Sequence, residues 1–355
     1  MKFAKEIFPL STKCLDGRAM KPYEIVLTAD RSFMSDYHFL PFLKGLRFAS
    51  TTLLDPFIFF SFAGSPVPAV DGIALLAPYH TRRTEAALLD SGFDRSEVAI
   101  ATPEKICDLI GPNTKIVSIT VRDPLNEIHH YSLLNPLCKE SYSSISFKKL
   151  VRNLHSLRLA KEYNFKIVVE GPGAWQLANS EDMGRFAIDH VIIGEYITKA
   201  IPYLFEKIIE GEHAPQVSHA NCTDINEIPL IRGGVAEGRV EVGRGCNRHC
   251  RFCHAARLQC RPLKDIVAEA RVNSQCGQHN ITLRNNDILN YGSTGVRVNR
   301  KAVLSLYGSV SKVNGVKRVD QCYLSLASAV SEPSLIERSP TSSGQDPRNI
   351  PTLQC

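Results

Sequence analysis

The sequence predicts an α/β fold in two successive domains, of which the first is a doubly wound parallel sheet. In residues 22–212, short apolar or β-branched runs alternate with segments of helical periodicity. A second alternating series, with three βα units, occupies residues 238–338. Residues 213–237 show neither period and are predicted to be a linker. Strands that alternate with helices indicate a parallel sheet covered on both faces, because parallel strands need crossover connections.

Apolar runs that end at glycine, proline or polar residues predict the strands of the first domain. They lie at residues 23–29, 72–78, 98–102, 115–121, 165–170 and 188–196. The run DPFIFFSFAG at residues 55–64 is interpreted as one more buried strand. Helical spacing of apolar residues predicts helices at 82–93, 147–163 and 200–211. Residues 1–21 are assigned to an N-terminal lead-in.

The second series begins with the strand RVEVGRG at residues 239–245. Further strands are predicted at 280–287 and 321–328, and helices at 263–272, 299–313 and 332–339. Residues 339–355 are polar and rich in proline and serine, which predicts a disordered tail.

Composition excludes several classes of protein. The 355 residues carry a net charge of +6 without a run of lysine and arginine, so nucleic-acid binding is not expected. No stretch approaches the roughly 18 apolar residues that a membrane helix needs. The N-terminus shows no leader pattern, and the eleven cysteines are an odd number, mostly isolated. These features predict a cytoplasmic protein with reduced thiols.

The segment GCNRHCRFC places three cysteines, Cys246, Cys250 and Cys253, on a polar loop between a predicted strand and a helix. Zinc could be held if Cys260 or His254 completed the set. A redox pair would need only Cys250 and Cys253 and would leave Cys246 unexplained. Three thiolates can also hold three irons of a [4Fe–4S] cluster and leave the fourth iron open.

The Cys-x3-Cys-x2-Cys spacing after the strand VEVGRG, with Phe252 before the last cysteine, resembles the signature of the radical SAM superfamily. The resemblance implies that Cys246, Cys250 and Cys253 bind a [4Fe–4S] cluster that cleaves S-adenosylmethionine (SAM), with electrons from a flavodoxin- or ferredoxin-like donor. It assigns SAM contacts to Phe252, Asn286, Asp287 and Ser325. The family barrel has more βα units than the three found here, so a partial (β/α) barrel, apparently truncated, is predicted.

The first domain resembles the cobalamin-binding domain that precedes the radical core in one class of these enzymes. The resemblance lies in APYHTRRTEAALLDSGF, KIVSITVRDPLN, KIVVEGPGAWQL and DHVIIGEYITKAIPYLFEKII, in this order. It implies a Rossmann-like domain whose cobalamin contacts are Thr120, Arg122, Asp123, Gly171, Gly173, Trp175, Gly194 and Glu195. An Asp-x-His-x-x-Gly motif is missing from the sequence, so cobalt would be bound without a histidine ligand.

Together the two resemblances imply a cobalamin-dependent radical SAM C-methyltransferase that acts on an unactivated carbon of a protein or a small molecule. The pattern is most similar to archaeal members of the family, which makes methyl-coenzyme M reductase one candidate substrate. A radical SAM methylthiotransferase or cyclase is an alternative. A non-catalytic protein that binds cobalamin or a cluster beside an incomplete barrel is another.

Overall fold

The computed structural model describes residues 23–37, 55–62, 64–127, 140–194, 200–220, 224–251, 253, 256–337 and 352–354. The chain divides into two compact units, Met1–Thr223 and Asp224–Cys355, and the division falls within the predicted linker. The predicted lead-in and most of the predicted tail lie outside the described residues.

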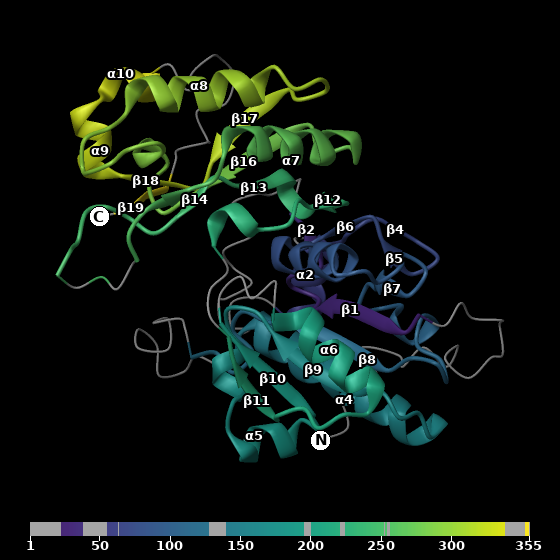
Figure 1. Cartoon of the computed structure of the whole chain (residues 1–355). Helices are drawn as coiled ribbons and strands as arrows, with labels where there is room; N and C mark the ends of the chain where they lie inside the picture. Colours follow the sequence, from purple (N-terminus) through teal and green to yellow (C-terminus); the bar gives the residue numbers. More distant parts are fainter. Residues whose placement is uncertain are drawn as a thin grey trace. The chain divides into compact units, whose positions relative to one another are not determined.

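The first unit contains a six-stranded sheet in the order β11-β10-β9-β8-β1-β7 (Figure 1). Its strands are β1 (Ile25–Ala29), β7 (Val98–Ile100), β8 (Ile116–Thr120), β9 (Lys166–Glu170), β10 (His190–Ile193) and β11 (Val217–His219). Every neighbouring pair is parallel. The strand order reverses beside β1, so the sheet is doubly wound and its switch point lies between β1 and β8.

Helices cover both faces of this sheet, as the prediction of a doubly wound fold requires. They are α2 (Tyr79–Asp90), α4 (Tyr142–Lys161), α5 (Ser180–Arg185) and α6 (Ala200–Glu210), with the 3-10 turns η3 (Ile106–Asp108) and η4 (Ala174–Leu177). Phe147, Leu150 and Leu154 of α4 pack in one core cluster with Val117 and Ile119 of β8. Helices α2 and α6 contact each other and lie against β1 and β8.

Three stretches of the first unit differ from the prediction. Residues 55–64 form helix α1 (Pro56–Phe62), in which Phe59 is buried, and not a strand. The helix begins after Asp55, whose carboxylate accepts a hydrogen bond from the Phe57 N–H, and proline occupies its first position. Both residue types favour helix starts, so Asp-Pro was the signal that outweighed the aromatic run.

The second difference is at the linker, where β11 extends the sheet. Its three residues are too few to show the alternation of a strand. The predicted strand at 72–78 is also divided, into β5 (Ile73–Ala74) and β6 (Leu76–Ala77). Strand β5 pairs with β4 (Ala69–Val70), and β2 (Ser35–Asp36) pairs with β3 (Ser65–Pro66), both antiparallel.

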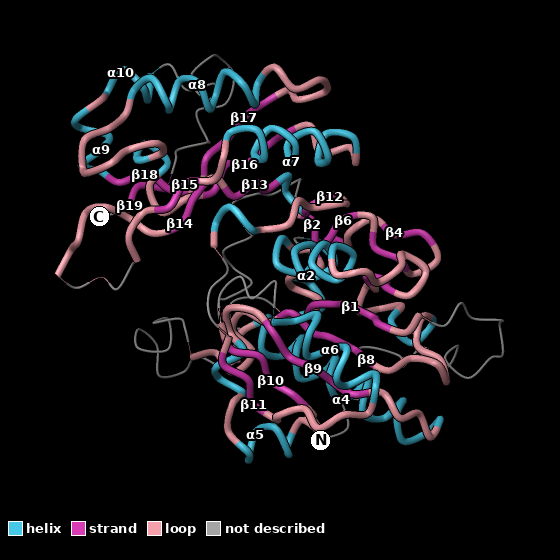
Figure 2. Tube along the Cα trace, viewed as in Figure 1, coloured by secondary structure: helices cyan, strands magenta, loops and turns pink. Residues whose placement is uncertain are grey.

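The second unit is built on three parallel strands in the order β13-β16-β17 (Figure 2). These are β13 (Arg239–Glu241), β16 (Asn280–Arg284) and β17 (Arg318–Gln321). Helices α7 (Leu263–Gln275) and α8 (Arg300–Ser311) contact each other. Their apolar residues, such as Ile266 and Leu306, share one core cluster with Val240, Ile281 and Val319 of the strands.

Short elements complete the second unit. They are η5 (Ile225–Glu227), β12 (Gly234–Val235), η6 (Ala236–Gly238), β14 (Gly243–Arg244), β15 (Gln259–Cys260), η7 (Ile288–Asn290), β18 (Tyr323–Ser325), α9 (Leu326–Ser331), α10 (Pro333–Glu337) and β19 (Thr352–Gln354). Strands β14 and β15 are antiparallel, whereas β18 and β19 are parallel. Strand β19 belongs to the stretch predicted to be a disordered tail.

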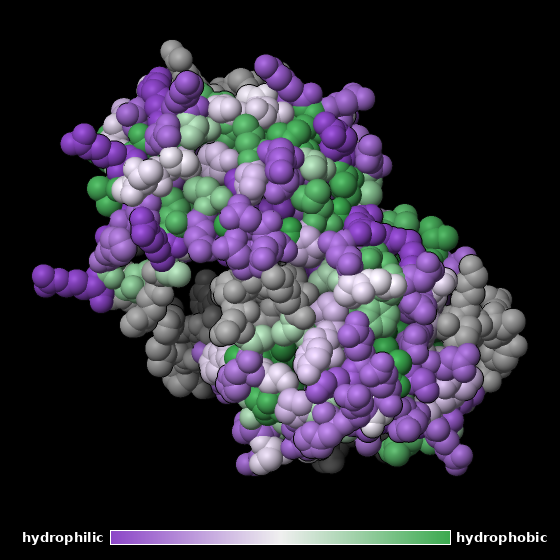
Figure 3. All heavy atoms as spheres, viewed as in Figure 1, coloured by the Kyte–Doolittle hydropathy of each residue, from purple (hydrophilic) through white to green (hydrophobic). Residues whose placement is uncertain are grey.

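Hydrophilic residues cover most of the visible surface of both units, with small groups of hydrophobic residues among them (Figure 3). Within the part of the chain that the structure describes, no helix has both the length and the apolar character to span a bilayer.

Candidate cluster site and candidate cofactor edge

The three predicted cluster ligands lie on the loop between β14 and β15. This loop follows β13, the first strand of the parallel sheet. It is entered through Gly245, whose φ of +75° is the left-handed conformation that favours glycine. A Cβ atom there would lie 2.3 Å from the Ala256 carbonyl oxygen, so the two ends of the loop come together closely. The Cys246 N–H donates to the Ala256 carbonyl at 2.8 Å, and this hydrogen bond closes the neck where the two ends of the loop meet.

The thiols of Cys246, Cys250 and Cys253 are all free, the first half-buried and the other two exposed. The Cys253 N–H donates to the Cys250 carbonyl at 3.0 Å, which places these two cysteines in one turn. Among the described residues, no three His, Cys, Asp or Glu side chains are already gathered in a metal-binding set. The donor chemistry and the short closed loop fit a thiolate-ligated cluster, and loading would have to draw the three thiols together.

Cys260, considered above as a fourth ligand for zinc, is the last residue of β15, where it pairs with Gly243. Its sulfur accepts a hydrogen bond from the Gly292 N–H at 3.2 Å, and it packs against the core of the second unit. Burial raises the pKa of this thiol. His254 lies outside the described residues.

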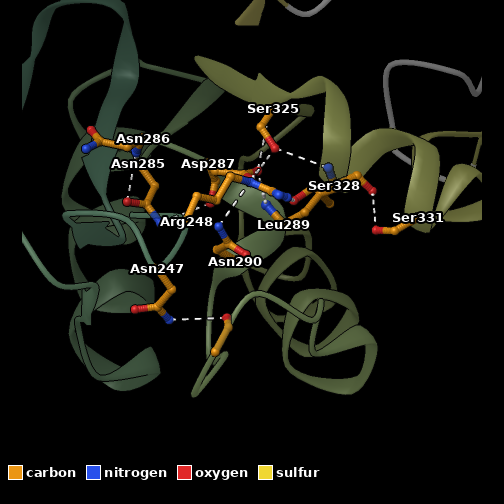
Figure 4. Close-up of polar contacts among 11 residues, drawn as sticks. Asn247, Arg248, Asn285, Asn286, Asp287, Leu289, Asn290, Ser325, Ser328 and Ser331 are labelled. Carbon is orange, nitrogen blue, oxygen red and sulfur yellow. Dashed lines mark hydrogen bonds and ion pairs between the residues drawn. The ribbon is translucent and has the colours of Figure 1, made fainter. Parts of the chain in front are cut away.

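Asp287 joins the loops that follow three strands of the second unit (Figure 4). Its carboxylate is 2% exposed and forms an ion pair with Arg248 of the cysteine loop, with 3.5 Å between Nε and Oδ2. The hydroxyls of Ser325, the last residue of β18, and of Ser328 in α9 donate to Oδ2 at 2.7 and 2.6 Å. Because the carboxyl ends of parallel strands share one edge, these residues meet although they are far apart in sequence.

Asp287 also organises its own loop. It accepts hydrogen bonds from the Leu289 N–H at 3.3 Å and from the Asn290 amide at 3.2 Å. The neighbouring Asn286 is exposed. Of the four predicted SAM contacts, the structure therefore brings Asp287 and Ser325 together, leaves Asn286 open to solvent, and does not describe Phe252.

At the sheet of the first unit, Thr120 and Glu170 stand in register at the carboxyl ends of β8 and β9. Glu170 is buried and accepts hydrogen bonds from the Thr120 hydroxyl and from the Thr84 hydroxyl of α2, the latter at 3.2 Å. Thr81 of α2 donates to Thr120 at 3.0 Å. Burial raises the pKa of the Glu170 carboxyl, against the opposing effect of the two threonine hydrogen bonds.

The predicted glycines Gly171 and Gly173 bring two loops of the first unit into direct contact. A Cβ on Gly173 would lie 2.1 Å from the Arg122 carbonyl oxygen, and one on Gly171 would lie 2.7 Å from the Val121 oxygen. The Gly173 N–H donates to Val121 O at 3.1 Å. Glycine is therefore required at these positions because two segments of the chain's own backbone meet there.

Asp123 completes the contact between these loops. Its Oδ1 accepts hydrogen bonds from the Gln176 amide and from the Glu127 N–H, both at 2.8 Å. Trp175 is 48% exposed and Arg122 is half-buried at this edge. Gly194 follows β10 with a φ of +146°. Glu195 lies outside the described residues.

Sequence reasoning missed several residues that build these two edges. Arg248 was one of several polar residues in the cysteine loop, and Thr81, Thr84 and Glu170 looked like ordinary members of a helix and a strand. The position of Glu170 was the usable signal, because a carboxylate at the end of a buried parallel strand needs a specific partner.

Three solved structures share this fold. The radical SAM methyltransferase TsrM from Kitasatospora setae, with cobalamin and a [4Fe–4S] cluster bound, is 15% identical, with a TM-score of 0.50 over 85% of this chain and 56% of that one. TsrM with tryptophan substrate and the SAM analogue aza-SAM gives 14% identity and 0.50, over 85% and 55%. The cobalamin-dependent SAM radical enzyme OxsB with aqua-cobalamin gives 13% and 0.51, over 88% and 40%.

No family model matches the sequence, and no curated protein matches it either. The chain spans about half the length of the solved enzymes it resembles. The fold and its likeness to these structures confirm the predicted fold class, a Rossmann-like doubly wound domain followed by a partial (β/α) barrel. They also confirm the predicted resemblance to cobalamin-dependent radical SAM enzymes, at the level of the fold.

Proposed function

We propose that this chain is a cobalamin-dependent radical SAM enzyme that transfers a methyl group to an unactivated carbon. The observation that carries the proposal is the position of the Cys-x3-Cys-x2-Cys loop. It follows the first parallel strand of an α/β unit, presents three free thiols, and belongs to a fold shared with TsrM and OxsB. The predicted cluster ligands remain Cys246, Cys250 and Cys253.

The cofactors proposed here are a [4Fe–4S] cluster, SAM and cobalamin. When bound, the cluster supplies the electron for reductive cleavage of SAM, and cobalamin supplies the capacity to carry a methyl group. The chain's own residues provide the thiols and the neck at Gly245 that closes their loop. Asn286, exposed on the loop after β16, is the accessible polar group for the SAM amino or carboxylate end. The Ser325 hydroxyl already donates to Asp287, so SAM would have to share this hydroxyl with the Asp287 carboxylate.

For cobalamin we propose the carboxyl edge of the six-stranded sheet, at the ends of β8, β9 and β10 on one side of the switch point. Ligands of doubly wound sheets bind at such points. The exposed Trp175 ring offers a flat apolar surface, and Arg122 offers a cation that suits an anionic nucleotide tail. The hydrogen bonds and backbone contacts beneath this edge involve the other predicted residues Thr120, Asp123, Gly171 and Gly173. Gly194 and Glu195 follow the next strand.

The test is anaerobic reconstitution of the full chain with iron and sulfide, with and without cobalamin and SAM. We expect iron that remains bound after desalting, a visible spectrum that changes with cobalamin, and formation of 5′-deoxyadenosine under reduction. Zinc in place of iron would contradict the cluster. Iron binding without any response to cobalamin would leave a radical SAM enzyme of another type, such as a methylthiotransferase or cyclase.

The substrate belongs to the same proposal. A protein or a small molecule would be methylated, with methyl-coenzyme M reductase as one candidate and a flavodoxin- or ferredoxin-like protein as electron donor. Incubation with that enzyme and mass analysis of its peptides tests the candidate. Cofactor binding without cleavage of SAM would instead support a non-catalytic binding protein.

A further inference from the structure

Two consecutive side chains between the first and second cysteines point into the second unit. Asn247 is buried, and its amide donates to the carbonyls of Ser293 and Gly295 at 3.4 and 3.3 Å. Arg248 reaches the Asp287 carboxylate and also donates from Nη2 to the Ser328 hydroxyl. Figure 4 shows both side chains extending away from the loop backbone toward these partners.

The backbone turns outward directly after this pair. His249 has a φ of +50°, which is unusual for a residue other than glycine. Its side chain and that of Cys250 are exposed. The side chains of the loop therefore change from pointing into the second unit at Arg248 to facing solvent at Cys250. Such conformations persist when the surroundings fix them, and the contacts of the adjacent Arg248 provide such a constraint.

Asp287 is well suited to fix Arg248. Its carboxylate is 2% exposed and is held from its own loop, from β18 and from α9 before Arg248 is considered. Arg248 Nε lies 3.5 Å from Asp287 Oδ2 as an ion pair without a hydrogen bond, and the charge-assisted hydrogen bond of the guanidinium is the one that Nη2 donates to Ser328. The guanidinium is 21% exposed, so it is held mainly by the protein.

We propose that Arg248 is a positioning residue, which fixes the cysteine loop through Asp287 to the loop after β16 and through Ser328 to helix α9. This inference rests on the proposed function, because the loop it positions is the one proposed to hold the cluster. Asp287 acts here as the anchor for the loop. Fixing the segment between Cys246 and Cys250 reduces the number of arrangements from which three thiols must be drawn together.

The experiment compares Arg248→Met with Arg251→Met in the full chain without cofactors. Arg251 lies on the same loop and is exposed, so its variant changes the loop charge equally. Hydrogen exchange of the Cys246–Cys253 amides is followed by mass spectrometry. We expect exchange about tenfold faster in Arg248→Met, the scale expected for loss of one hydrogen-bonded charge contact, and unchanged in Arg251→Met. Arg248→Lys, which keeps the cation, should be intermediate.

The second measurement is loss of iron to a chelator after anaerobic reconstitution. Loss should be about 10- to 100-fold faster in Arg248→Met than in the wild type or in Arg251→Met, as for other residues that orient metal ligands. Equal exchange and equal iron loss in the two methionine variants would overturn the inference. If Arg248→Met unfolds, Arg248→Lys decides: intermediate exchange supports the anchor, and wild-type exchange contradicts it.

The two levels of the proposal fail separately. A wild-type chain that binds no iron contradicts the proposed function, whereas the difference in hydrogen exchange still tests the anchor. If the wild-type chain binds iron, and all variants show the same hydrogen exchange and the same loss of iron, the proposed function stands and Arg248 has no positioning role.

Discussion

The two units both place a buried carboxylate at the carboxyl edge of a parallel sheet, but they give it different partners. Glu170 in the first unit accepts hydrogen bonds from neutral threonine hydroxyls, and burial raises its pKa. Asp287 in the second unit is bonded by serine hydroxyls and faces the Arg248 cation. The first edge is therefore organised around a buried carboxyl held by neutral hydroxyls, and the second around an ion pair.

The contacts between neighbouring loops differ in the same way. In the first unit Gly173 brings one backbone against another, with no room for a side chain. In the second unit the loops are tied by side chains, through Asp287, Ser325 and Arg248. A backbone contact has little freedom to adjust, whereas a side-chain tie can be released by one substitution without overpacking. The first edge is therefore held by backbone packing, and the second by side-chain contacts.

The largest expected effect is loss of the cluster from the second edge. Cys250→Ala should abolish the absorbance at roughly 400 nm that thiolate-ligated iron–sulfur centres show after reconstitution, because one of three iron ligands is removed. The matched control is Cys276→Ala, which removes another exposed thiol, at the end of α7. Iron retained by Cys250→Ala, or lost equally in both variants, would contradict the assignment of the ligands.

The next effect concerns the backbone contact at the first edge. Gly173→Ala should destabilise the first unit by about 1–3 kcal/mol, as overpacking does, because the new methyl group meets the Arg122 carbonyl. Gly184→Ala is the control: its Cβ meets open space in α5, and removing a helical glycine should stabilise by about 0.5–1 kcal/mol. Urea unfolding measures both. Equal free energies of unfolding for the two variants would show that the loops are not locked together.

A smaller effect is expected from Ser325→Ala at the second edge. The Ser325 hydroxyl donates to Asp287 and accepts from the Ser328 N–H at 3.1 Å, which caps α9. Its loss should lower the free energy of unfolding by about 1 kcal/mol. Ser331→Ala removes an exposed hydroxyl bonded only locally to the Ser328 carbonyl and should cost less. If the two variants have the same free energy of unfolding, the hydrogen bonds of Ser325 make no special contribution to stability.

The smallest effect depends on pH and separates the two carboxylates. Because the pKa of Glu170 is raised above its ordinary value of 4.5, the native state keeps this proton to higher pH than the unfolded chain does. Its contribution to the free energy of unfolding is therefore full below pH 4.5 and is lost as the pH rises through the raised pKa. Glu170→Gln should gain stability relative to the wild type across that range, as measured by urea unfolding at a series of pH values.

The control for this series is Glu181→Gln, an exposed glutamate in the first turn of α5. Its difference from the wild type should not follow the Glu170 titration. A constant difference between Glu170→Gln and the wild type over the whole range would show that this carboxyl keeps the same pKa in both states.

Much of the architecture could be predicted because it depends on local patterns. Residues 116–120 and 166–170 are runs rich in isoleucine and valine that end in a polar residue, and the structure has β8 and β9 there. Helix α1 was predicted incorrectly because an aromatic run suits a strand as well as a helix, and the decisive Asp55–Pro56 start was not weighted. Strand β11 was missed because it acquires its conformation from pairing with β10, and three residues carry no period of their own.

The sequence by itself determined the two alternating series, the spacing of the three cysteines and the resemblance that those features carry. Only the tertiary structure decided how Asp287 is partnered, that Gly173 meets Arg122, and that Glu170 lies among the threonines of α2. The physical reason is that spacing along a chain is local, whereas burial and pairing arise between segments far apart in sequence. Arg248 and Asp287 are 39 positions apart, and only the shared edge of a parallel sheet brings them together.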